Sequence, residues 1–225
     1  MSGPKIRNSV RINLGCGATP TEEWTNYDNS FTVRLARAPI LCRILGTAGV
    51  LSPQQIQFAA TVRQHGIRYA NVARRIPHDD HSVDVVYCSH MLEHLDRAEA
   101  ELFLREVRRV LIPGGIVRLV VPDIRLLVTE YLTSGDADIL VERTLLAVPR
   151  QRSTVARAKA LIAGAREHMW MYDGPSLANL LDDVGFVEPQ ILPPGETTII
   201  EPGALDLRER VEESVYVEAR EPRGT

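Results

Sequence analysis

Short apolar runs recur along the chain and predict the strands of a sheet. Residues 10–14 alternate between apolar and polar side chains, which is the pattern of a strand that enters a core. Residues 84–88 are almost continuously apolar, as expected for a strand buried on both faces of a sheet. Further strands are predicted at residues 24–28, 67–72, 116–121, 186–192 and 214–219.

Helical periodicity fills most of the segments between these strands. In residues 96–111 the apolar side chains lie on one helical face, and Pro113-Gly114-Gly115 is expected to end that helix. Residues 174–184 predict a second clear helix. Only about ten residues separate the first two strands, which is too few for a crossover helix of the usual length, so we expect a shortened helix or turn at residues 21–23.

Two stretches are longer than the sheet requires. Residues 29–66 predict helices interrupted at Pro39, with a second helix at 53–65, and residues 123–165 predict helices with connectors near 134–136 and at Pro149. The first stretch follows a strand end, so we expect it either to cover the core or to act as a lid over a substrate. Without an internal repeat or a linker, we expect one domain over residues 1–225 with two insertions.

Composition narrows the class of protein. The chain has 225 residues, 44% of them hydrophobic, 24% charged, and a formal net charge of −3. This is ordinary for a globular protein and argues against a nucleic-acid or membrane-surface partner. The first residues lack an apolar signal segment, and the three cysteines have no metal-ligand spacing, which favours a cytoplasmic protein with reduced thiols.

A glycine turn at the end of the first strand is the central motif. Gly15 and Gly17 flank Cys16, and Asp28 closes the second strand eleven residues after Gly17. Glycines allow a ligand to approach the backbone closely, and bare amides with a nearby carboxylate suit an adenosine-type cofactor whose ribose hydroxyls need an acceptor. Taken alone, Gly-Cys-Gly is equally well explained as a plain tight turn.

The motifs that accompany this turn, and their order in the sequence, resemble those of a known family. The turn, Asp28, residues 82–94 and residues 111–116 follow one another as in class I S-adenosylmethionine-dependent methyltransferases with "LGCG" and "LEHL" signatures. The resemblance covers about residues 10–121, and 172–186 supports it. It implies an α/β, Rossmann-like sandwich with a mostly parallel seven-stranded sheet, an antiparallel last strand, helical insertions and S-adenosyl-L-methionine as cofactor.

The resemblance also implies a set of cofactor-binding residues. They are Asn13, Gly15, Cys16, Gly17, Asp28 and Ser89. Two departures stand out: Asn13 takes the place where many of these enzymes have an acid, and Ala18 takes the place of a common third glycine. The first departure puts a carboxylate contact to the methionine amino group in doubt, although the Asn13 side-chain oxygen can still accept a hydrogen bond.

Methyl transfer to a hydroxyl profits from a general base. His90 follows the predicted strand at 84–88, Glu93 lies one turn further, and Asp123 ends the strand at 116–121. His168 lies in a polar and aromatic segment with Trp170 and Tyr172. We therefore name His90, His168, Asp123 and Glu93 as catalytic candidates, and expect His94 to fix the loop. Core packing, hydrogen bonding and helix capping are the alternative roles.

The aromatic segment suggests a carbohydrate acceptor. Trp170 and Tyr172 are candidates for a sugar-binding wall, since aromatic faces suit the apolar face of a pyranose. The segment at 168–173 is similar to small methyltransferases encoded with carbohydrate-assembly enzymes. The arginine-rich, lysine-poor composition is similar to that of actinobacterial sugar O-methyltransferases acting on the reducing-end hydroxyl of methylmannose-polysaccharide precursors.

Other functions stay open at this stage. A lipid or phenol acceptor is the competing enzyme hypothesis, and a non-catalytic cofactor-binding module is the alternative of another class. A nicotinamide dehydrogenase is disfavoured because Asp28 comes earlier than the usual spacing of about 20 residues and the third glycine is absent. We expect no metal-ligand set from the motifs; a metal requirement and a homodimer are left open.

Overall fold

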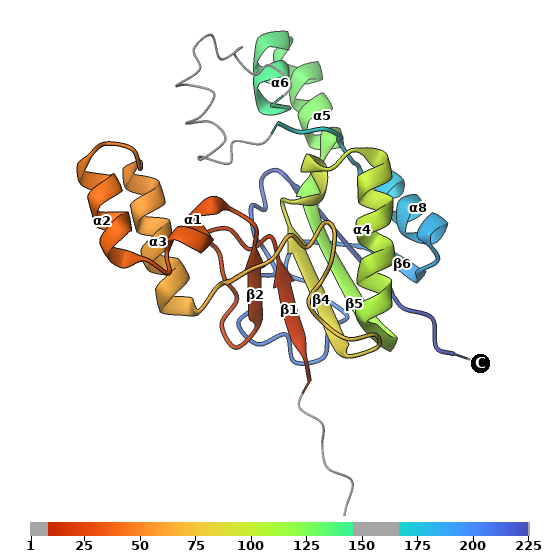
Figure 1. Cartoon of the computed structure of the whole chain (residues 1–225). Coiled ribbons are helices and arrows are strands. Elements are labelled where there is room, and N and C mark those ends of the chain that lie inside the picture. The colour runs from red at the N-terminus through yellow and green to blue at the C-terminus, as the bar shows by residue number, and fades with distance from the viewer. Residues whose placement is uncertain (1–8, 146–166, 225) are drawn as a thin grey trace, which may run out of the picture.

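The computed structural model describes residues 9–145 and 167–224 (Figure 1). Its strands are β1 (Arg11–Leu14), β2 (Thr25–Asp28), β3 (Arg68–Tyr69), β4 (Val83–Ser89), β5 (Leu111–Pro122), β6 (Val187–Leu192) and β7 (Ser214–Arg220). Its helices are α1 (Phe31–Leu35), α2 (Pro39–Thr47), α3 (Pro53–His65), the 3-10 turn η1 (Leu92–His94), α4 (Arg97–Val110), α5 (Ile124–Ser134), α6 (Ala137–Arg143) and α8 (Gly174–Val184). The prediction of helices up to residue 165 falls partly outside the described residues.

The strands form one sheet in the order β3-β2-β1-β4-β5-β7-β6. The pairs from β3 to β5 are parallel, and β7 is antiparallel to both β5 and β6. This confirms the predicted seven-stranded, mostly parallel sheet with an antiparallel last strand. The strand order reverses between β1 and β4, and open sheets of this kind bind ligands at the carboxyl ends of the strands beside such a reversal.

The expected boundary between α4 and β5 is wrong. Gly114 and Gly115 were expected to separate helix from strand, but α4 ends at Val110 and β5 begins at once. The register against β4 shifts near Val83, and a Cβ on Gly115 would lie 2.9 Å from the Ile112 carbonyl oxygen. The glycine therefore serves an irregularity within the paired strand, since only a residue without a side chain fits there.

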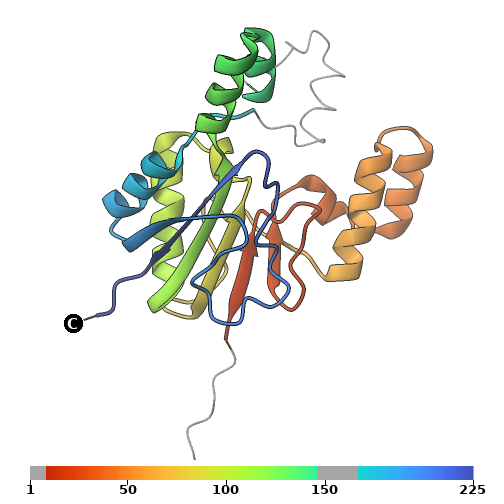
Figure 2. The ribbon, with the colours of Figure 1, turned by 180° about the vertical axis from the view of Figure 1, so that it is seen from behind.

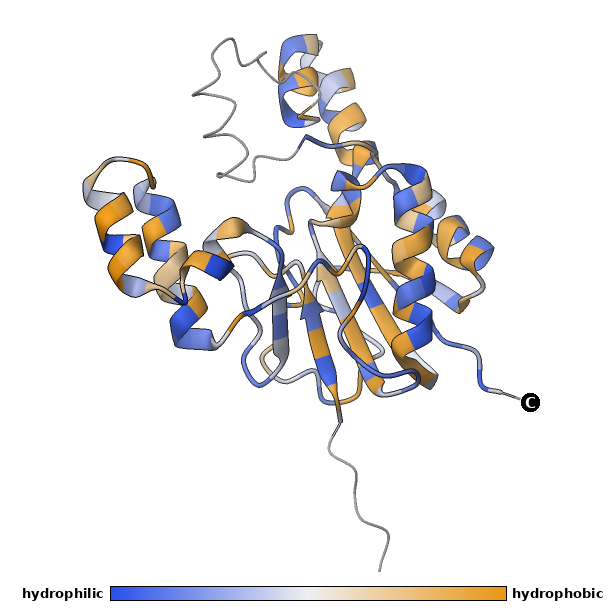
Figure 3. Ribbon diagram, in the orientation of Figure 1, coloured by the Kyte–Doolittle hydropathy of each residue, from blue (hydrophilic) through white to orange (hydrophobic). Residues whose placement is uncertain are grey.

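One face of the sheet is covered by α4 and α8 (Figure 1). Side chains of both helices belong to the main core with those of β1, β4 and β5, and Phe103 and Leu177 are fully buried there. Both helices begin with a capping box, from Asp96 and Asp173. Figure 3 shows the hydrophobic colouring concentrated along the central strands and on parts of these helices, as the apolar periodicity predicted.

The other face is covered by the connection between β6 and β7, residues 193–213 (Figure 2). The chain between β1 and β2 makes a turn rather than a crossover helix, as its length predicted. Ile199 and Leu205 of the connection bury their side chains against Trp24, Tyr87 and other residues of this face. The connection thus supplies the apolar cover that a crossover helix would otherwise provide.

The connection is fastened by a buried ion pair. Arg118 of β5 is fully buried and donates to Glu218 of β7 at 2.6 Å and to the Glu196 carbonyl at 3.0 Å. Glu218 also accepts from Thr197 and from the backbone and hydroxyl of Thr198. Because several donors share the carboxylate, the pair couples the sheet to the connection.

The insertion after β2 forms its own small core. Val33 and Leu35 of α1 pack with Cys42, Ala59 and Val62 of α2 and α3. Figure 1 shows α2 and α3 beside the sheet rather than over its faces. Among the described residues no helix is both long enough and apolar enough to cross a membrane.

Candidate functional site

The glycine turn after β1 is tied to β2. The amides of Gly15 and Cys16 donate to the Tyr27 carbonyl at 2.9 and 3.0 Å, and the Gly17 amide donates to Asp28 at 3.3 Å. The expectation that the amides of this turn are bare is therefore wrong for this structure, because β2 already accepts from them. The turn is held rigidly beside Asp28, whose other carboxylate oxygen accepts from the Ser30 amide at 2.7 Å.

The turn still offers space and an acceptor to a ligand. Gly17 has φ +49°, and a Cβ there would meet no atom of the described residues within 4 Å. Asn13 is 1% exposed; its amide nitrogen donates to Thr21 at 3.1 Å, while its side-chain oxygen has no hydrogen-bond partner in the described part of the chain. A buried orphan acceptor is costly unless a ligand or water satisfies it. These features fit the expected cofactor, whose amino group is a donor.

Cys16 and Ser89 occupy different surroundings. The Cys16 side chain packs into the core of the insertion with Val33 and Leu35, and burial raises its pKa well above the usual range. It therefore anchors the turn to the insertion and does not present a thiolate. Ser89 ends β4 and is buried at the same edge of the sheet.

A cavity of about 730 Å³ opens beside this edge rather than directly over the glycine turn. Its lining includes Asn29 after β2, Asn71 and Ala73 after β3, and His94 and Leu95 after β4. It is large enough for a small-molecule ligand. Residues that follow β2, β3 and β4 therefore line one cavity, together with residues of α4 such as Glu99 and Arg105.

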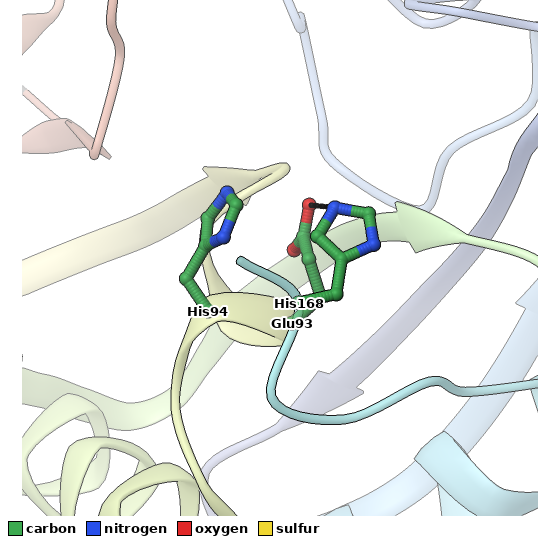
Figure 4. Close-up of side chains that lie close together, drawn as sticks. All are labelled: Glu93, His94 and His168. Carbon is green, nitrogen blue, oxygen red and sulfur yellow. Dashed lines mark ion pairs between the residues drawn. The ribbon is translucent and has the colours of Figure 1, made fainter. Parts of the chain in front are cut away.

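Glu93 is the most unusual residue at this edge. It is 1% exposed, and neither of its carboxylate oxygens has a hydrogen-bond partner among the described residues. The His90 Nδ1 lies 3.4 Å from Glu93 Oε1, and the His168 Nε2 lies 4.0 Å from the same oxygen. The rings of His94 and His168 are tilted by 57° to each other, with centroids 5.2 Å apart. Two imidazole nitrogens therefore lie within 4.0 Å of one buried carboxylate oxygen, and Figure 4 shows Glu93 with His168 and His94 beside it.

Backbone contacts bring these residues together from two distant segments. The amides of Met169 and Trp170 donate to the Glu93 carbonyl at 2.7 and 3.2 Å, and His94 Nδ1 lies 3.1 Å from the Glu167 carbonyl. A Cβ on Gly15 would lie 2.9 Å from the Met91 side chain. The cluster thus lies next to the glycine turn and is held by the fold.

The two catalytic histidine candidates differ in how their ring nitrogens are used. His90 has φ +49°, its Nε2 lies 2.9 Å from the Ser214 hydroxyl, and its Nδ1 also lies 3.3 Å from Arg210. Within residues 9–145 and 167–224, Nδ1 of His168 has no hydrogen-bond partner. Burial lowers the pKa of His168, and the Glu93 carboxylate opposes this shift. His168 is therefore favoured in the neutral, proton-accepting form.

The remaining candidates divide between structural and exposed positions. Asp123 caps α5 by accepting from the Arg125 amide at 2.9 Å, and burial raises its pKa. Tyr172 is fully buried in the main core, and burial raises its pKa to about 12. Trp170 is 45% exposed, with Arg97 5.9 Å from its ring centroid. Of the two aromatic residues assigned to a sugar-binding wall, Trp170 thus has the accessible ring.

Residues 209–214 also contribute contacts to the candidate site, although no sequence motif predicts them. Glu209 accepts from the Tyr87 hydroxyl at 2.5 Å and from the Thr19 hydroxyl at 3.1 Å, which places a carboxylate beside the glycine turn. Arg210 and Ser214 contact His90. These residues lie in a charged stretch without a motif, and their contact partners are more than 100 residues away in the sequence. For both reasons no local sequence pattern predicts their role.

Replacing Asp28 by asparagine is expected to weaken S-adenosylmethionine binding about ten- to a hundredfold, because a hydrogen bond to a charged acceptor contributes roughly 1.5–3 kcal/mol. Asparagine keeps an oxygen for the Ser30 amide, so the loop should stay folded. Calorimetric titration measures the affinity, and Asp183→Ala on the exposed side of α8 is the control. Unchanged affinity in Asp28→Asn would assign the ribose contact to another residue.

One protein-family model matches the part of the chain that contains much of the candidate site. Residues 29–119 match the family described as "Methyltransferase domain". The matched segment includes the insertion, β3, β4, α4 and most of β5. It therefore contains Glu93, His94 and the wall of the cavity. No curated protein matches the chain by sequence.

Solved structures share the fold. An S-adenosylmethionine-dependent methyltransferase from Thermotoga maritima has a TM-score of 0.52 at 17% identity, with 96% of this chain and 84% of that chain covered. One from Methanosarcina mazei has a TM-score of 0.52 at 17% identity, covering 97% and 95%. A chain from the complex of the Haloferax volcanii Trm112 methyltransferase activator has a TM-score of 0.51 at 14% identity, covering 99% and 86%. At these identities the likeness concerns the fold.

Proposed function

We propose that this chain, which is a methyltransferase with S-adenosylmethionine as its cofactor, methylates a hydroxyl group of a carbohydrate. The observation that carries the proposal is the buried Glu93 carboxylate with His168 beside it, next to the exposed Trp170. A neutral amine acceptor would need little base assistance, whereas a hydroxyl profits from a positioned base. The cofactor, when bound, supplies an electrophilic methyl group.

Asp28 and Asn13 are proposed to hold that cofactor. Asp28 accepts from ribose hydroxyls, and the Asn13 side-chain oxygen accepts from the amino group of the methionine part. Gly17 leaves the space above the turn open, and Ser89 lines the same edge. Hydrogen bonds to β2 already fix the glycine turn, so the turn loses little conformational entropy when the cofactor binds.

His168 is proposed as the base that takes the proton from the acceptor hydroxyl. Burial lowers its pKa, which favours the neutral form, and its Nδ1 has no hydrogen-bond partner among the residues that the structure describes. The Glu93 carboxylate stabilises the imidazolium that forms. Both ring nitrogens of His90 lie near other protein groups. We therefore rank His90 second and Asp123 third as candidates for the general base.

The acceptor is proposed to lie against Trp170. An exposed indole suits the apolar face of a sugar ring, and the imidazoles beside it can satisfy neighbouring hydroxyls. The reducing-end hydroxyl of a methylated mannoside is one such acceptor. The insertion at residues 29–66 follows the end of β2, and we propose that it closes over the ligand edge as a lid.

S-adenosylmethionine, or its demethylated product, is expected to raise the melting temperature of the protein, whereas NADH should leave it unchanged. At a hundredfold excess over the dissociation constant, binding to the native state alone adds about 2.7 kcal/mol to the free energy of unfolding. Differential scanning fluorimetry measures the shift. A shift with NADH and none with either methionine compound would contradict the cofactor assignment.

Labelled methyl transfer to sugar, lipid and phenol acceptors, followed by mass spectrometry, tests the acceptor class. We expect label on a sugar hydroxyl. Label on a lipid or phenol alone would replace the carbohydrate proposal with the competing acceptor. Binding of the cofactor without transfer to any acceptor would instead favour a non-catalytic module.

A further inference from the structure

We propose that Glu93, His94 and His168 form a binding site for a divalent transition-metal cation of the Zn²⁺ type. Each of the three residues offers one ligand atom, and these atoms lie within 4.8 Å of one another. Two ligand atoms that are each about 2.0–2.2 Å from one ion lie at most ~4.4 Å apart. Small side-chain rotations therefore suffice to bring all three ligands onto one ion.

The state of Glu93 is the first argument for an ion. A carboxylate that is 1% exposed is costly unless it is paired or hydrogen-bonded, and in the part of the chain that the structure describes both Glu93 oxygens are without a hydrogen-bond partner. Imidazole nitrogens of His90 and His168 lie 3.4 and 4.0 Å from Glu93 Oε1. A divalent cation would balance the carboxylate charge and occupy the lone pairs that the fold leaves unused.

The state of His94 is the second argument. Its Nδ1 faces the Glu167 carbonyl at 3.1 Å, so a proton on Nδ1 donates to that carbonyl and leaves Nε2 with a lone pair. Metal-ligating histidines typically make this kind of contact, because it fixes the tautomer and the ring orientation. The bonds from Met169 and Trp170 to the Glu93 carbonyl hold the two ligand-bearing segments together.

The ligand set decides the kind of cation. Two imidazoles and one carboxylate suit Zn²⁺ and related ions, whereas Mg²⁺ and Ca²⁺ prefer all-oxygen sites. Three protein ligands leave coordination positions open for water or substrate. His90 is not included, because its Nδ1 lies 3.3 Å from the Arg210 guanidinium and its Nε2 lies 2.9 Å from Ser214. The geometry thus argues against the expectation that the motifs contain no metal-ligand set.

A bound ion would contact ligands in the cavity, because His94 lines it. If the ion coordinated the acceptor hydroxyl, it would lower the pKa of that hydroxyl. The proton would then pass to solvent water, because His168 as a metal ligand has no lone pair left to accept it. This role rests on the proposed methylation of a hydroxyl. Binding of the ion to Glu93, His94 and His168 does not depend on it.

Metal content tests the site directly. Protein treated with EDTA, loaded with Zn²⁺ and dialysed should retain one Zn²⁺ per chain by mass spectrometry of the metal. Co²⁺ in its place should give visible absorption bands. Glu93→Gln and His94→Ala should lose the retained Zn²⁺ and the Co²⁺ bands, whereas His65→Ala, in the last turn of α3, should keep both.

Several outcomes would overturn the site. These are no retained Zn²⁺ in the wild type, retention by both Glu93→Gln and His94→Ala, or a melting shift with Mg²⁺ that Zn²⁺ does not produce. Circular dichroism of the metal-free variants checks that they fold. Retained Zn²⁺ with no sugar methylation would leave the site standing and contradict the acceptor assignment alone.

Discussion

Replacing His168 by alanine is expected to lower turnover about 10²–10⁴-fold, because a general base acts in the transition state. Its affinity for S-adenosylmethionine should change little, since the residues proposed to bind the cofactor lie at the ends of β1, β2 and β4. Turnover at saturating acceptor and calorimetric titration of the cofactor measure the two quantities separately.

His90→Ala is the companion variant, and His65→Ala on α3 is the control. Near-normal turnover in both the His168 and the His90 variant would contradict a histidine base. Asp123→Asn would then be the variant to measure, because a carboxylate at the end of β5 is the remaining candidate.

The metal proposal gives the His168 result a second interpretation, because His168 is also a proposed ligand. His94→Ala separates the two roles. If His94→Ala loses Zn²⁺ and keeps its turnover, methyl transfer does not use the ion and the His168 effect reports on proton transfer. If both variants lose Zn²⁺ and turnover together, the ion contributes to the reaction.

Replacing Glu218 by alanine is expected to lower the free energy of unfolding by about 3–5 kcal/mol, because it leaves the Arg118 charge buried without its partner. Arg118 is fully buried, and Glu218 is 2% exposed. The connection at residues 193–213 should loosen as well, since Thr197 and Thr198 lose their acceptor. Urea unfolding measures the change.

Two further variants test this explanation. Glu130→Ala removes an ion pair with Arg143 whose side chains are 44% and 34% exposed, and exposed pairs contribute only about 0–1 kcal/mol. Arg118→Met combined with Glu218→Leu removes both buried charges and should be more stable than Glu218→Ala. A Glu218→Ala protein as stable as the wild type would show that water reaches Arg118.

The local sequence is sufficient for most elements of the fold. The helix predicted at residues 174–184 coincides with α8, because Asp173 caps its start and Gly185, with φ +99°, ends it. The apolar run at 84–88 lies within β4. Apolar periodicity and capping act over a few residues, so a linear sequence displays them fully. The boundary at residues 111–116 failed because a proline and two glycines signal a break, whereas strand pairing tolerates them through an irregular register.

The candidate site likewise combines features that the local sequence predicts with features that it does not predict. The sequence by itself determined the glycine turn, Asp28 and the polar segments after β4 and before α8, because each follows a strand end or precedes a capped helix. Tertiary structure alone decided that β2 accepts from the turn amides, that residues 193–213 cover a sheet face and that His168 meets Glu93. These contacts join residues far apart in the chain, and their partners are selected by packing and by the burial of charge, which no local pattern encodes.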